Sequence, residues 1–187
     1  MEPVILASRS PRRSELLALA GIPFECEPAD IEEVMNEDLP MDERMAELAY
    51  HKALPVFEKH PERIVIGADT IVYIDDQVIG KAHDRQEAKD ILSHLSGRTH
   101  QVMTGVCVLS KDRKETFTVT SDVCFYDLNE AEIEEYLDLN EWQGKAGAYA
   151  IQGCGCRFIK EIHGDYSNIV GLPVAKLSRL LKTLKND

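Results

Sequence analysis

Residues 5–17, ILASRSPRRSELL, join an apolar run to a leucine-rich segment through Ser-Arg-Ser-Pro-Arg-Arg. We predict a short buried strand at Val4 to Ala7, followed by a helix that ends at Gly21. Ser10 is expected to be the N-cap of this helix, with Pro11 in its first turn. The corner between strand and helix is therefore a helix N-terminus that carries several arginines.

This corner has the composition of a phosphate-binding site. Backbone N–H groups at a helix start carry the positive end of the helix dipole, and Arg12 and Arg13 add charge and bidentate donors. Cations at this end oppose the dipole by about 0.3–1 kcal/mol unless an anion offsets them. The alternative interpretation is that the arginines simply pair with nearby acids such as Glu15.

Residues 64–68, IVIGA, form a continuous apolar run that predicts a strand buried on both faces and ending at Asp69-Thr70. Open α/β sheets bind ligands at the carboxyl ends of their strands. Asp69 is therefore a candidate for binding Mg²⁺ or orienting a water molecule. The alternative is a turn or cap in which Thr70 satisfies the carboxylate.

The remaining periodic segments predict further strands and helices. Strands are expected at residues 24–27, 100–109, 116–126 and 157–162, and in a hairpin of 71–74 with 78–79. Helices are expected at 41–54, before Pro55, after the capping boxes Asp84/Glu87 and Asn129/Glu132, and after residue 173. Because helices and strands do not alternate strictly, we predict an α/β fold with a mixed twisted sheet and flanking helices.

Composition limits the classes of function. The 187 residues include 33 acidic and 21 basic side chains, a net charge of −12, and 6% aromatics, which argues against binding to nucleic acid. No linker-like stretch divides the chain, so we expect a single domain over residues 1–187. The absence of a signal peptide pattern or a membrane-length apolar run predicts a cytoplasmic protein that does not contact membranes.

The five cysteines are predicted to be reduced core thiols. A zinc site beginning at Cys154 and Cys156 lacks a second pair of ligands. The sequence also lacks the H-E-x-x-H, G-x-S-x-G and G-x-x-x-x-G-K-[ST] patterns. Zinc hydrolases, serine hydrolases and P-loop kinases therefore lose support.

Four further charged residues are candidates for a phosphate or metal site. Lys52 and Lys81 can act as point charges on phosphate, although each is alternatively a solvated surface lysine. Glu32 and Glu33 can supply a carboxylate to a divalent metal, although the pair is alternatively a solvated acidic loop.

Taken together, these residues belong to a series of motifs that resembles a known family. The motifs are LASRSPRR (6–13), IEE (31–33), Lys52, GADTIV (67–72), GK (80–81), LSGRTHQVMTGV (95–106), KAGAYAIQG (145–153) and GLP (171–173). In order and spacing they resemble the Maf-like nucleoside triphosphate pyrophosphatases over nearly the whole chain. The resemblance implies two lobes around a deep central cleft, as in inosine triphosphate pyrophosphatases, and a cytoplasmic enzyme that is often a homodimer.

The resemblance also implies an activity. Family members hydrolyse nucleoside triphosphates between the α and β phosphates with a divalent metal, Mg²⁺ or Mn²⁺. They are viewed as housecleaning enzymes against non-standard nucleotides, with a link to septum formation. By resemblance, the catalytic residues are Arg13, Lys52, Lys81 and Asp69 as proton acceptor, and the metal ligands are Asp69 and Glu33, with Glu32 adjacent.

Substrate binding is assigned by the same resemblance to Ser8, Arg12, Thr70 and Gln152. Gln152 resembles the branch that acts on dTTP and UTP, whereas the branch that prefers 7-methyl-GTP carries another residue there. Two alternatives stay open: a pyrophosphatase for 7-methyl-GTP or another modified nucleotide, and a nucleotide-binding division regulator without catalysis.

Overall fold

The computed structural model describes residues 2–32 and 34–184. Within them lies a sheet of seven strands, β1 (Val4–Leu6), β2 (Phe24–Cys26), β3 (Val65–Ile74), β4 (Gln77–Ile79), β5 (Thr99–Ser110), β6 (Arg113–Phe125) and β7 (Ile159–His163). The strand order is β2-β1-β3-β5-β6-β7, and β4 pairs with β3. β1 is parallel to β2 and β3, whereas the β3–β4 and β6–β7 pairs are antiparallel. The predicted α/β class with a mixed sheet is confirmed.

The chain divides into two compact units. Unit 1 comprises the residues up to Thr70, Thr104–Val119 and those from Gly171 on, and unit 2 comprises Ile71–Met103 and Thr120–Val170. Strands β3, β5 and β6 each begin in one unit and end in the other. The predicted single domain over residues 1–187, with its deep central cleft, stays a prediction.

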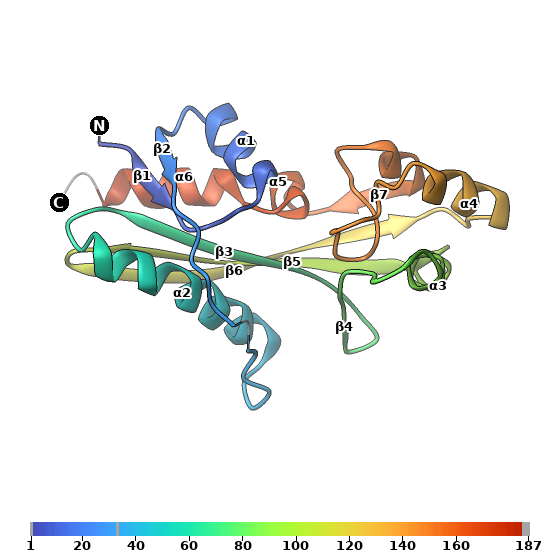
Figure 1. The fold of residues 1–187 in the computed structure, drawn as a ribbon, viewed down its shortest axis with the longest axis horizontal. Coiled ribbons are helices and arrows are strands. Elements are labelled where there is room, and N and C mark those ends of the chain that lie inside the picture. The colour runs from blue at the N-terminus through green and yellow to red at the C-terminus, as the bar shows by residue number, and fades with distance from the viewer. Residues whose placement is uncertain (1, 33, 185–187) are drawn as a thin grey trace. The chain divides into compact units, whose positions relative to one another are not determined.

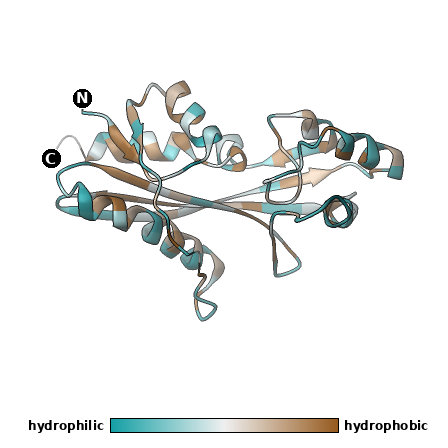
Figure 2. Ribbon diagram, viewed as in Figure 1, coloured by the Kyte–Doolittle hydropathy of each residue, from teal (hydrophilic) through white to brown (hydrophobic). Residues whose placement is uncertain are grey.

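Unit 1 has helices on both sides of its strands. Helices α1 (Pro11–Leu19) and α6 (Val174–Thr183) lie on one side, and α2 (Met41–Lys59) lies on the other (Figure 1). Hydrophobic and hydrophilic residues alternate along α2 in Figure 2, as expected for a helix that buries one stripe. That stripe, which includes Ala49, Ala53 and Val56, packs on strand residues such as Val65.

Two glycines let the backbone of α2 approach the sheet closely. A Cβ atom on Gly67 would lie 2.3 Å from the carbonyl oxygen of Ala49, and one on Gly105 would lie 2.0 Å from that of Met45. Both positions therefore require glycine. Because Lys52 lies on the segment of α2 that packs against Gly67, this contact also fixes the position of the lysine.

Unit 2 contains α3 (Arg85–Leu95), α4 (Glu130–Asp138), the 3₁₀-helix η1 (Cys154–Phe158) and α5 (Tyr166–Val170). Its core includes Leu92, Val123, Tyr136 and Phe158. Asn129 and Glu132 form the predicted reciprocal capping box at the start of α4. The predicted hairpin is β3–β4, with positive φ at Asp75 and Asp76 in its two-residue turn. None of the helices in the described part of the chain is long and apolar enough to cross a membrane.

Two predicted boundaries are wrong. The strand expected to end at Asp69 continues as β3 to Ile74, because the buried residues that follow extend the run and pair with β4. The helix expected to stop before Pro55 continues to Lys59. Proline removes the hydrogen bond to the carbonyl of His51, but His51 is exposed to water, and the buried Val56 keeps the next turn packed.

Further corrections concern caps and short elements. Ser10 occupies the N-cap position of α1, but its side chain makes no capping hydrogen bond. Asp84 caps α3 by accepting from the Glu87 N–H at 2.8 Å, but the Glu87 carboxylate contacts His83 and does not complete the box. The strand predicted from Arg157 begins at Ile159, because the preceding residues form η1, and helix α5 was not predicted.

Candidate active site

The site in unit 1 starts where β1 ends. Leu6 pairs with Ile66 as the last residue of β1, and the N–H of Ala7 still donates to the Ile66 carbonyl at 2.8 Å. The chain then leaves the sheet, and the Ser8 hydroxyl accepts from the N–H of Ser10 at 3.1 Å. Such a local turn is a common use of serine. The first turn of α1 follows at once, and its Arg13 side chain reaches Thr70 of β3.

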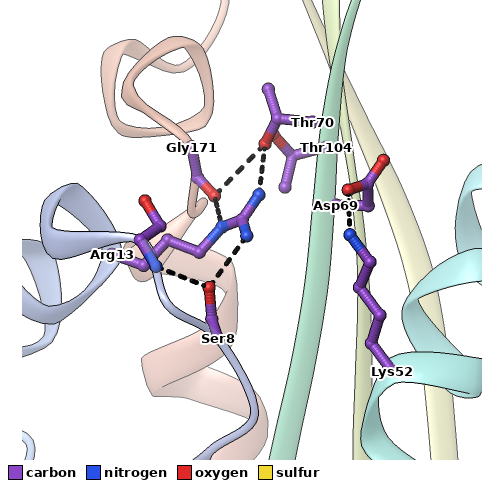
Figure 3. Close-up of polar contacts among 8 residues, drawn as sticks. Ser8, Arg13, Lys52, Asp69, Thr70, Thr104 and Gly171 are labelled. Carbon is purple, nitrogen blue, oxygen red and sulfur yellow. Dashed lines mark hydrogen bonds and ion pairs between the residues drawn. The ribbon is translucent and has the colours of Figure 1, made fainter. Parts of the chain in front are cut away.

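Arg13 fills this corner and is buried. Its Nη1 donates to the Ser8 hydroxyl at 3.1 Å, its Nη2 to the Thr70 hydroxyl at 3.0 Å, and its Nε to the Gly171 carbonyl at 2.8 Å. These three acceptors come from three distant parts of the chain (Figure 3). The planar guanidinium is therefore held in one orientation.

The acceptors of Arg13 are themselves tied together. Thr70 shares a hydroxyl hydrogen bond of 2.9 Å with Thr104 on β5 and donates to the Gly171 carbonyl at 3.4 Å. Gly171 has φ of +136°, a backbone region that favours glycine, and this conformation turns its carbonyl toward Arg13. The motif GLP thus contributes a backbone oxygen rather than a side chain.

Lys52 and Asp69 form a second cluster in unit 1. The Lys52 ammonium donates to the Asp69 carboxylate, and each side chain is 13% exposed. Successive residues of a strand point to opposite faces. Figure 3 shows Thr70 pointing toward Arg13, whereas Asp69 points toward Lys52 on the other side of β3. Arg13 and Lys52, from two different helices, thus contact neighbouring residues of β3, Thr70 and Asp69, in two separate clusters.

For the charged residues of unit 1, the structure supports one alternative interpretation and contradicts two others. Arg9 does pair with Asp30, at 3.6 Å and in an exposed setting. Burial lowers the pKa of Arg12 from its ordinary value, and the nearby charge of Glu15 partly opposes that shift. Lys52 is not a solvated surface lysine, and Asp69 is not a turn or cap, because the two are paired inside unit 1.

The predicted site residues of unit 2 lie in two loops whose backbones are paired with each other. Lys81 is exposed, and its backbone forms an isolated antiparallel bridge with Ala146. The N–H of Gly147 donates to the Gly80 carbonyl at 3.1 Å, which extends this pairing. Gln152 follows in the same loop and is exposed. The motifs GK and KAGAYAIQG are therefore adjacent in the fold.

The predicted metal ligands are only partly described. Glu33 lies outside the described residues, and Glu32 is exposed. Within residues 2–32 and 34–184, no three His, Cys, Asp or Glu side chains gather closely enough to hold a metal ion. The five cysteines are free thiols, but the prediction of core positions is wrong for Cys26, Cys154 and Cys156, which are exposed.

Comparison with known proteins gives the family. The model of the Maf-like protein family matches residues 3–184. This chain belongs to the Maf-like family. A dTTP/UTP pyrophosphatase of Bacillus velezensis is 49% identical over 96% of this chain and 95% of its own. A dTTP/UTP pyrophosphatase of Bacillus pumilus is 47% identical over 98% of this chain and 97% of its own. Among solved structures, the Staphylococcus aureus Ham1 protein matches 67% of this chain and 73% of its own at 13% identity and a TM-score of 0.49.

Several contacts in this Maf-like chain were not predicted from its sequence. Thr104 and Gly171 lie inside two of the motifs that carry the resemblance, but no role was assigned to either of them. His100 and Tyr149 also lie in such motifs, and they meet in unit 2, where Nε2 of the imidazole lies 2.7 Å from the phenol oxygen. The sequence feature that could have pointed to these contacts is that all four residues lie in the motifs that carry the resemblance.

Proposed function

We propose that this protein hydrolyses nucleoside triphosphates, above all dTTP and UTP, between the α and β phosphates, as a housecleaning enzyme. The observation that carries the proposal is the Lys52–Asp69 pair, found in a chain whose relatives are named dTTP/UTP pyrophosphatases. A positioned carboxylate can accept a proton from water, and fixed cations can offset the charge of a triphosphate.

The reaction needs a general base and charge stabilisation. Water adds to a phosphorus atom, the bridging P–O bond breaks, and one proton passes from the water to the Asp69 carboxylate. Lys52 holds that carboxylate in place by its ion pair. Arg13 stabilises the phosphates together with the N–H groups of the first turn of α1, whose N-cap side chain makes no hydrogen bond to them. The products are a nucleoside monophosphate and pyrophosphate.

The predicted ligands of a divalent metal are two carboxylates. Mg²⁺ is usually held by one or two carboxylates, with phosphate oxygens and water completing its shell, and Mn²⁺ accepts the same ligands. Asp69 and Glu33 would supply the carboxylates. When bound, such an ion neutralises phosphate charge and polarises the P–O bonds. An acidic chain can then take an anionic substrate.

The choice of substrate is assigned to Arg12, Thr70 and Gln152, and Lys81 adds a further cation for the phosphates. These assignments rest on the resemblance in motif. The exposure of Lys81 and Gln152 supports them, because a ligand can reach both side chains. We also propose that the protein is cytoplasmic and forms a homodimer. Sedimentation or light scattering of the purified protein tests the oligomeric state.

A panel of nucleotides tests the function. The protein is incubated with dTTP, UTP, CTP, GTP and 7-methyl-GTP in the presence of Mg²⁺ or Mn²⁺, and the products are separated. We expect monophosphate and pyrophosphate, with dTTP and UTP turned over fastest. Preference for 7-methyl-GTP would move the protein to the other branch. Tight nucleotide binding without turnover would identify a binding protein.

A further inference from the structure

The loop at residues 145–153 is fixed at its start by backbone contacts. Ala146 bridges to Lys81, and the N–H of Gly147 donates to the Gly80 carbonyl at 3.1 Å. The two residues that follow the bridge have positive φ, +71° at Gly147 and +58° at Ala148. Positive φ is unfavourable for alanine, so the surrounding structure must hold this turn in place.

Tyr149 is the inward anchor of the loop. Its phenol oxygen lies 2.7 Å from Nε2 of His100, which comes from β5. The rings of Tyr149, His100 and Phe125 meet edge to face, with centroid distances of 4.9, 5.0 and 5.4 Å. Such aromatic contacts are directional and resist sliding. Tyr149 is therefore fixed both by packing and by one buried hydrogen bond.

His100 and Tyr149, which we call the anchor pair, are both neutral at pH 7. Burial lowers the pKa of His100 to about 4, and burial raises the pKa of Tyr149 above its ordinary value. Nδ1 of His100 is buried and has no hydrogen-bond partner among the described residues. The bond to Tyr149 is thus the polar contact that orients the imidazole. Removing either partner leaves a buried polar group without it.

Other hydrogen bonds hold the backbone on either side of Gln152. The N–H of Ala150 donates to the Tyr136 hydroxyl at 3.2 Å, and the Glu141 carboxylate accepts from the N–H groups of Cys154 and Gly155 at 3.0 and 3.2 Å. Gln152 lies between these two contacts and is exposed. Its placement thus depends on Tyr149 and Tyr136 on the N-terminal side and on Glu141 on the C-terminal side.

We infer that His100 is a positioning residue for substrate selection, because its hydrogen bond to Tyr149 fixes the backbone that carries Gln152. The inference rests on the proposed function, in which Gln152 contacts the nucleotide. His100 itself does not touch the substrate. It acts through Tyr149, and the loop from Ala146 to Gln152 moves when that bond is lost.

The test uses variants that remove the bond and keep the packing. His100→Phe and Tyr149→Phe each retain a ring, and Tyr149→Phe removes a single oxygen atom. We expect each to raise the KM for UTP about tenfold, with kcat changed less than about twofold. His100→Gln, whose amide reaches about as far as Nε2, should recover part of this loss. The double variant should be no worse than either single variant, because both remove the same bond.

Two controls separate positioning from general destabilisation. Ser121→Ala removes a different buried hydroxyl of unit 2, which bonds to Asp165 and Asn168 and not to the loop, and should leave the KM for UTP unchanged. Amide hydrogen exchange reports on the loop without any need for turnover. Exchange in residues 145–153 should rise in His100→Phe and Tyr149→Phe but not in Ser121→Ala.

Each outcome supports or overturns the inference. An unchanged KM and unchanged loop exchange in folded variants would overturn it, as would multiplied effects in the double variant or an equal change in Ser121→Ala. If the wild-type protein turns over no nucleotide, the proposed function fails. Faster loop exchange in the anchor variants would still support positioning, and unchanged exchange would overturn it.

Discussion

The two units bury polar side chains in different states of charge. Unit 1 holds Arg13, which is 9% exposed, and the Lys52–Asp69 ion pair. Unit 2 holds His100 and Tyr149, which are neutral because burial lowers the pKa of the first to about 4 and raises that of the second. Charged side chains on fixed elements can bind an anionic substrate. A neutral pair can fix the shape of a loop without changing the electrostatic potential that the substrate meets. Chemistry and shape are thus assigned to different residues.

Removing the Asp69 carboxylate should have the largest effect on activity. Asp69→Asn keeps the size of the side chain but cannot accept a proton from water, so kcat should fall about 10³-fold. Pyrophosphate release from UTP measures this. The matched control is Asp122→Asn, a half-buried carboxylate on β6, which should stay within about twofold of the wild type. An Asp69→Asn enzyme that keeps a tenth of the wild-type rate would contradict the assignment.

The neutral state of His100 predicts a pH dependence of stability. Its pKa is about 4 in the folded protein against an ordinary value of 6.5, so the unfolded chain binds the proton first as the pH falls. The contribution of neutral His100 to the free energy of unfolding is fully present above pH 6.5. About 3 kcal/mol of this contribution is lost between pH 6.5 and pH 4. Urea unfolding of the wild type and His100→Phe over this range measures the difference. Parallel curves for the two proteins would show that His100 is not the group responsible.

Arg13→Lys should separate charge from geometry. Lysine keeps the positive charge but cannot donate in the three directions that reach Ser8, Thr70 and Gly171. We expect kcat/KM for UTP to fall about 10²-fold, as when one oriented donor is lost from an active site. A fall of less than about threefold would mean that charge alone suffices in this corner.

Gly67→Ala tests the close approach of α2. The added methyl would meet the backbone of Ala49 and Ala53, with the nearest atom at 2.3 Å, so the turn that carries Lys52 must shift. We expect the free energy of unfolding to fall by about 2 kcal/mol in urea titrations. Gly80→Ala, which has open space around the new methyl, should lose less than about 0.5 kcal/mol. Equal losses in the two variants would rule out this steric explanation.

Thr70→Val should have the smallest effect. It removes the hydroxyl that accepts from Arg13 and bonds to Thr104, and keeps the shape of the side chain. Loss of one such contact predicts about a tenfold fall in kcat/KM. Thr70→Ser keeps the hydroxyl and serves as the control, so a similar loss in both variants would assign the effect to packing instead.

Local patterns predicted the elements but not the contacts that orient the site. The strand–helix corner at residues 5–17 and the capping box at Asn129 follow from short-range rules, and both elements are present. The partners of Arg13 at Thr70 and Gly171 are 57 and 158 residues away along the chain. No local pattern encodes such pairs, because they form only when the sheet and α6 are in place.

The error at Asp69 has a physical reason. A polar pair after an apolar run normally marks the end of a strand. Here β3 continues through it, because Asp69 is paired with Lys52 and Thr70 with Arg13, so neither polar side chain is left without a partner. The sequence rule failed at two of the residues to which we assign function, and functional sites are where a fold tolerates polar groups inside a strand.

The role of Asp69 in UTP hydrolysis can be tested in a single reaction. UTP is mixed with the protein and Mg²⁺, and ³¹P NMR identifies the products for the wild type and for Asp69→Asn. We expect UMP and pyrophosphate from the wild type and almost no product from the variant. UDP and orthophosphate, or equal rates from the two proteins, would contradict this expectation.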